Sequence, residues 1–216
     1  MNVDAPDLAS QPLQNGPRPV LERAVSFLNT TGLINGRPFE DLPTAAAAIE
    51  WLANGGFLDG EAAAAEGRRF EAAADGGRPD LRRVHAARAG LRELTDALAE
   101  DRAPRAFALD GVNAVLRGRE TTQLVRAGTH LRLAHRREGT PVDQALAMIA
   151  RAIAEEMSEG RPERFRICKN DRCRWAFYDR SRPGTRRWCE MASCGNRMKA
   201  ARHRARHRAG SATAGS

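Results

Sequence analysis

The four cysteines of this 216-residue chain lie in its last quarter and form two pairs. Four residues separate the members of each pair, and fifteen residues separate the two pairs. Two short-range pairs joined by a longer loop are typical of a tetrahedral zinc site, in which each pair occupies one tight turn, or knuckle. The sequence therefore predicts one structural Zn²⁺ per chain, bound by the thiolates of Cys168, Cys173, Cys189 and Cys194.

Three alternatives compete with this assignment. Two disulfides need an oxidising compartment, and residues 1–20 lack the apolar run of a secretion signal. Four free thiols are unexpected in so polar a segment. A two-cysteine, two-histidine site that uses His203 and His207 would leave Cys168 and Cys173 without a metal. We therefore place both histidines on a solvent-exposed basic surface.

Catalysis is not expected at this site, because four thiolates fill the coordination sphere and a catalytic zinc keeps one position open. The chain contains no Gly-x-Ser-x-Gly, no phosphate-binding loop that ends in Gly-Lys-Ser/Thr, and no His-Glu-x-x-His. Residues 164–208 are too few and too charged to fold on a core of their own, so the metal must stabilise them. We expect Trp175, Phe177 and Trp188 to pack around it.

The net charge of +8 is distributed unevenly along the chain. Residues 1–160 contain 19 Lys+Arg and 23 Asp+Glu, whereas residues 161–216 contain 16 and 4. A basic segment beside a mildly acidic body indicates a polyanionic partner for that segment alone. The alternative is an arginine-rich tail that contacts only solvent.

The basic segment contains two groups of candidate nucleic-acid contacts. We expect Asn196 to cap a helix that carries charge on all sides, and such a helix beside a zinc knuckle suits a DNA groove. The arginines between the knuckles suit phosphates. The candidates are Arg180, Arg182, Arg186, Arg187, Asn196, Arg197, Lys199, Arg202, Arg204, Arg206 and Arg208. Duplex DNA is the predicted partner, and RNA or a protein is the alternative.

Arg197 differs from the other basic residues because the last zinc ligand anchors it. A fixed arginine in the first helical turn could read a guanine edge, and the alternative is a structural role within the finger. Arg206 and Arg208 lie near the end of the helix, where we expect mobile phosphate contacts.

The elements that must position these residues are mainly helical. Apolar residues recur at helical spacing over residues 20–29, 45–52, 81–98, 107–116 and 142–157. Thr44 and Thr140 are N-cap candidates. Asn35-Gly36 and Ala127-Gly128 are turn dipeptides that predict two hairpins. No apolar run reaches the ~18 residues that a membrane helix needs, so we expect a cytoplasmic protein.

Composition divides the chain into four parts. Residues 1–19 are rich in proline and predict a disordered arm. Residues 20–160 predict a mainly α domain with a small β element (α+β). Residues 161–208 predict the zinc module, a β-hairpin knuckle followed by a basic helix, and residues 209–216 a disordered tail. Gly160-Arg161-Pro162 marks the boundary, and we expect residues 20–160 to stay soluble when cut there.

The zinc module resembles a known family. Phe177-Tyr178-Asp179 precedes Arg187-Trp188-Cys189, and Cys194-Gly195-Asn196-Arg197 follows. Over residues 164–208 this pattern is similar to the CGNR zinc finger, which is named for those last four residues.

Upstream, Leu28-Asn29-Thr30, Glu50-Trp51-Leu52 and Gly56-Phe57-Leu58 are similar to the ABATE domain. This domain usually precedes the CGNR finger in stress-induced bacterial transcriptional regulators. The resemblance implies a DNA-binding regulator that is associated with the nucleoid when bound. Its N-terminal domain would sense a signal or form a homodimer.

Overall fold

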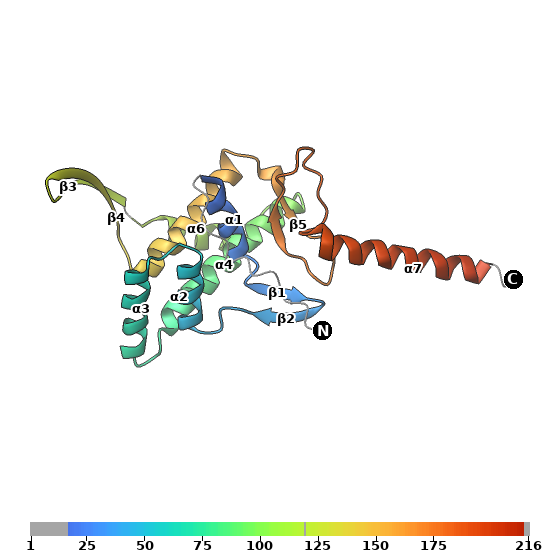
Figure 1. The fold of residues 1–216 in the computed structure, drawn as a ribbon, viewed down its shortest axis with the longest axis horizontal. Coiled ribbons are helices and arrows are strands. Elements are labelled where there is room, and N and C mark those ends of the chain that lie inside the picture. Colours follow the sequence, from blue (N-terminus) through green and yellow to red (C-terminus); the bar gives the residue numbers. More distant parts are fainter. Residues whose placement is uncertain (1–16, 119, 214–216) are drawn as a thin grey trace.

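The computed structural model describes residues 17–118 and 120–213 (Figure 1). Its body consists of six helices, which bury one apolar face each against a common core. They are α1 (Pro17–Phe27), α2 (Ala45–Asn54), α3 (Gly60–Ala72), α4 (Arg78–Ala99), α5 (Ala106–Leu116) and α6 (Pro141–Ser158). α4 is the longest of these six and packs against α2, α5 and α6, while α1 lies on α6.

The N-termini of two helices form as their sequences predict. The Thr44 hydroxyl accepts a hydrogen bond from the Ala47 N–H at 3.1 Å. At α6 the Thr140 and Asp143 side chains each accept a hydrogen bond from the other residue's backbone N–H. This is a capping box, with Pro141 at the first helical position. Both threonines are therefore N-caps.

Two antiparallel hairpins extend from the helical body. β1 (Thr31–Ile34) pairs with β2 (Arg37–Glu40), and β3 (Glu120–Ala127) pairs with β4 (His130–Arg137). Asn35 and Gly36 have φ of 57° and 82°, as the tight turn between β1 and β2 requires. Both hairpins confirm the sequence prediction, and β3–β4 projects away from the helices (Figure 1).

The C-terminal segment begins with η2 (Pro162–Arg164) and an antiparallel hairpin of β5 (Phe165–Ile167) and β6 (Ala176–Tyr178). One turn of π-helix, η3 (Met191–Gly195), leads directly into α7 (Asn196–Thr213). α7 extends away from the rest of the molecule (Figure 1). The predicted hairpin knuckle and basic helix are both present.

The β5–β6 hairpin is part of the helical core. Phe165, Ile167 and Ala176 are almost fully buried and belong to the same apolar cluster as the body helices. The Asn29 side chain also makes two 2.8 Å hydrogen bonds, one from its Nδ2 to the Ala176 carbonyl and one from the Ala176 N–H to its Oδ1. Without the hairpin, residues 20–160 would expose apolar side chains of this core, and the solubility of that fragment stays a prediction.

Three further details differ from expectation. α1 begins at Pro17, so part of the predicted arm is helical, and α7 continues to Thr213, beyond residue 208. Leu98, the last residue of the apolar pattern predicted over residues 81–98, is 42% exposed because it lies at the end of α4. Residues 1–16 and 214–216, the other parts of the predicted arm and tail, lie outside the described residues. None of the described helices is long and apolar enough to span a membrane.

The shared core predicts that a cavity in the finger hairpin destabilises the helical body. Phe165→Ala should lower the free energy of unfolding by about 3–5 kcal/mol, because it removes buried apolar surface and leaves a void. Urea unfolding followed by the helical circular dichroism signal measures this.

Phe107→Ala is the matched control, since Phe107 is 52% exposed on α5 and its loss should change stability little. An unchanged urea midpoint for Phe165→Ala would show that the hairpin and the helices do not share a core.

Candidate metal centre and nucleic-acid surface

The first knuckle is the turn between β5 and β6. The Cys168 N–H donates to the Trp175 carbonyl at 2.8 Å, which extends the hairpin ladder by one step. The N–H groups of Cys173 and Arg174 both donate to the Asn170 carbonyl, at 2.8 and 3.0 Å. Arg174 takes φ of 60°, which turns the chain back into β6. Cys168 and Cys173 therefore project from the same tight turn.

The second knuckle is formed by the chain that enters α7. Cys189 precedes η3, Cys194 lies within it, and the Gly195 N–H donates to the Glu190 carbonyl at 3.0 Å. A Cβ atom at Gly195 would collide with the Met191 sulfur. Gly195 does not have a positive φ, so a larger residue here would require the exposed Met191 side chain to move rather than a strained backbone.

The two knuckles bring all four sulfur atoms within 4.8 Å of one another. The Sγ atoms of Cys173 and Cys189 are 3.7 Å apart, and those of Cys189 and Cys194 are 3.8 Å apart. A Zn–S bond of ~2.3 Å places the sulfurs of a tetrahedron about 3.8 Å apart. The predicted ligand set is thus assembled with the spacing that a four-thiolate metal site needs.

The protonation of the thiols supports a cation between them. A hydrogen bond with Cys168 raises the pKa of Cys173 to about 12 and is also the largest cause of the raised pKa of Cys189. Hydrogen bonds from these two thiols in turn lower the pKa of Cys168. Without a cation the cluster therefore favours few thiolates, and a divalent metal would supply the missing positive charge.

Two buried polar residues hold the site in shape. Asn170 donates from Nδ2 to the Cys194 sulfur at 3.3 Å, which links the first knuckle to the second. Asp179 accepts the N–H groups of Ser181 and Arg186 at 2.9 and 2.7 Å and so fixes the loop between the knuckles. Burial opposes the ionisation of Asp179, but these hydrogen bonds lower its pKa overall. Sequence reasoning missed both roles, although both residues lie in segments that it singled out.

The aromatic residues near the cysteines divide into two groups. Phe177 and Trp188 pack against the sulfur cluster, as predicted. Trp175 does not pack against the sulfur cluster. The centre of its ring lies 6.5 Å from the centre of the Phe39 ring on β2. Trp175 therefore contacts the β1–β2 hairpin rather than the metal site.

Two of the predicted phosphate-binding arginines contact aromatic rings of the zinc-finger segment. The Arg186 guanidinium lies 5.0 Å from the centre of the Phe177 ring and donates to the Cys189 carbonyl. That of Arg187 lies 5.6 Å from the Trp188 ring. These cation–π contacts give both side chains a structural role.

The other candidates near the start of α7 and between the knuckles differ in the contacts that their side chains make within the protein. Arg180 forms a 2.6 Å ion pair with Glu22 of α1, whereas Arg182 is exposed. Asn196 is not an N-cap, because its φ and ψ of −66° and −39° are helical and its side chain donates to the Ala192 carbonyl. The chain is already helical in η3 when it reaches Asn196.

The candidates farther along α7 face solvent. Lys199, Arg202 and Arg206 line one shallow hollow with Ala205, which places three cations on one side of the helix. Arg204 is exposed as well. The side chain of Arg208 lies outside the described residues.

Arg197 makes a contact that neither sequence hypothesis anticipated. Its Nη1 donates to Oδ1 of Asn35, at the turn of the β1–β2 hairpin. The first turn of α7 is therefore attached to the N-terminal part of the chain. The sequence holds no local signal for this bond, because 162 positions separate the two residues.

The chain also matches two known families. Residues 164–207 match the CGNR zinc finger, and residues 21–160 match ABATE, described as a putative stress-induced transcription regulator. Neither is an enzyme family, and they occur in the predicted order. No curated protein matches the chain. Because the ABATE match covers more than half of the sequence, the chain belongs to the ABATE family of putative stress-induced transcription regulators and carries a CGNR zinc finger.

Proposed function

We propose that the protein is a zinc-dependent, stress-responsive transcriptional regulator that binds duplex DNA through α7. The observation that carries the proposal is a solvent-exposed helix that is basic on all sides and leaves the body directly after a cysteine of the metal cluster. Both family matches agree with a regulatory or nucleic-acid-binding role.

The dimensions of α7 suit a DNA groove. Its 18 residues span about 27 Å, and its diameter of ~10–12 Å fits a major groove that is ~12 Å wide. The helix contains no aspartate or glutamate, so nothing on its own surface neutralises the charge. Lys199, Arg202 and Arg206 would grip phosphates on one side.

The metal in this proposal is a single structural Zn²⁺ that Cys168, Cys173, Cys189 and Cys194 hold. Bound there, Zn²⁺ supplies positive charge and a cross-link, and no coordination position remains for catalysis. It would join a hairpin that is built into the helical core to the segment that leads into α7.

A homodimer through the N-terminal region is a further proposal. Leu124 and Leu131 are 63% and 67% exposed on the β3–β4 hairpin. Leu131 pairs with Arg126, two positions from Leu124, so both leucines lie on the same face of the ribbon. A second copy could cover these two leucines.

The zinc proposal predicts about one metal ion per chain in protein purified without chelator. Cys189→Ser should lose the metal and with it most of the duplex affinity, because three thiolates no longer close the tetrahedron. Elemental analysis and fluorescence anisotropy with labelled DNA measure the two effects.

Ser193→Ala, in the same turn, should change neither. Wild-type protein that contains no zinc would contradict the proposed cofactor.

The DNA proposal predicts that removing the positive charges from one face of α7 strongly weakens the binding of duplex DNA. The triple variant Lys199→Ala, Arg202→Ala, Arg206→Ala should lose about a hundredfold in affinity at ~0.15 M salt. The slope of log K against log[salt] should fall by about 0.9 for each lost phosphate contact. Anisotropy titrations over a salt series measure both quantities.

The matched control removes three exposed arginines from α3 and α4, with Arg68→Ala, Arg78→Ala and Arg82→Ala. Equal losses in both triple variants would show that α7 has no special role. Titrations with structured RNA and with heparin test the alternative partners, since RNA that binds more tightly than DNA would favour an RNA-binding module.

A further inference from the structure

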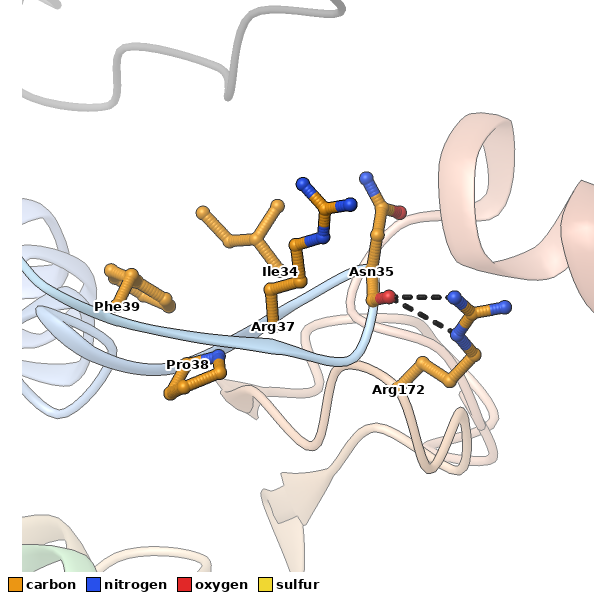
Figure 2. A pocket seen from close by; sticks show the side chains of 6 residues that line it. All are labelled: Ile34, Asn35, Arg37, Pro38, Phe39 and Arg172. Atoms are coloured by element: carbon orange, nitrogen blue, oxygen red, sulfur yellow. Dashed lines mark hydrogen bonds between the residues drawn. The ribbon is translucent and has the colours of Figure 1, made fainter.

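Three arginines surround the turn of the β1–β2 hairpin. Arg172, in the first zinc knuckle, donates from Nε and Nη2 to the Asn35 carbonyl at 3.1 and 2.8 Å (Figure 2). Arg197, in the first turn of α7, donates to the Asn35 side chain. Arg37 directly follows the turn and, with Arg172 and Asn35, lines a surface hollow of about 450 Å³. The turn thus lies where the body, the first knuckle and α7 meet.

The hairpin is held firmly at this junction. The Gly36 N–H donates to the Arg172 carbonyl at 2.9 Å, in addition to the two bonds that Arg172 makes to Asn35. A Cβ atom at Gly36 would lie 3.1 Å from the Arg172 Nε, so the turn and this side chain are in close contact. These bonds hold the turn, and with it the backbone of Arg37, against the first knuckle and the first turn of α7.

No carboxylate among the described residues neutralises the charge of this cluster. Elsewhere in the molecule arginines pair with carboxylates, as Arg88 does with Glu40 and Arg105 with Glu93. Among the described residues no carboxylate forms an ion pair with Arg37, Arg172 or Arg197, and the acceptors at Asn35 are neutral oxygens. Three guanidinium groups around one turn, without a counter-charge, form a surface that attracts an anion.

The place of the cluster indicates which anion it attracts. It lies at the base of α7 on the side of Arg197, whereas Lys199, Arg202 and Arg206 lie on the opposite side of that helix. A duplex that receives α7 in its major groove has one phosphate backbone on each side of the helix, so one backbone would pass the side on which the hairpin lies. An acidic peptide could use the same charges, but the continuity with α7 favours the backbone of the same nucleic acid.

We propose that the β1–β2 hairpin is a second DNA contact, in which Arg37 binds a backbone phosphate beside the duplex held by α7. This inference rests on the proposed function and deepens it. It assigns nucleic-acid binding to a segment of the ABATE region, outside the zinc finger. The asparagine turn positions the site, and Arg172 and Arg197 add charge to it.

Arg37→Ala tests the proposal in the full-length zinc-loaded protein with labelled duplex DNA. Affinity should fall about fivefold at ~0.15 M salt, and the salt slope should fall by about 0.9, as for one lost phosphate contact. Arg68→Ala is the control, because it removes the same charge from an exposed site on α3 and should change affinity much less.

A second variant separates binding from folding. Asn35→Asp keeps the oxygen that accepts the Arg197 bond and places a negative charge among the three arginines. It should bind DNA at least fivefold more weakly while its thermal unfolding temperature does not decrease. If Arg37→Ala and Arg68→Ala bind equally, or if Asn35→Asp binds like the wild type, the hairpin is not a DNA contact. The proposed function would still stand in that case, whereas a wild type without DNA affinity would overturn both.

Discussion

The direction of the basic helix depends on four sulfur atoms that lie within 4.8 Å of one another. Thiols this close oppose each other's ionisation, so four thiolates coexist only around a cation. Cys168 and Cys173 belong to a hairpin that is built into the helical core, whereas Cys189 and Cys194 belong to the segment that enters α7. A metal at this point would fix the helix to the core, and the binding surface that we propose depends on that connection.

The zinc finger and the N-terminal helices share one hydrophobic core. Phe165 and Ile167 of β5 pack on α4 within the core of the body helices, and Asn29 pairs with the backbone of β6. Arg197 also joins α7 to the β1–β2 turn. A rearrangement of α1 or α4 in response to a signal would therefore move the finger with it. This arrangement suits a regulator, because no flexible linker separates the part that could sense a signal from the part that could bind DNA.

Local signals in the sequence predicted the local structure well. The threonine caps and the Asn35-Gly36 turn each depend on residues that are near in the chain, and both formed as expected. The four cysteines, which the spacing predicted to come together, form one cluster. Contacts between distant segments were not predictable in this way. Trp175 packs near Phe39 rather than the cysteine cluster, and Asn170 donates to Cys194. Both contacts arise from tertiary packing, and no local pattern in the sequence indicates them. The exposed charge of α7 followed from composition, but its attachment at Asn35 did not.

Hydrogen–deuterium exchange of the zinc-loaded protein, with and without duplex DNA, tests the central claim most directly. α7 packs against little else from residue 199 to residue 206, so its amides should exchange quickly in the free protein. Bound DNA should slow exchange along α7, while the amides of α3 and the N-terminal half of α4 keep their rates. Slower exchange confined to the helical body, with α7 unchanged, would contradict the account.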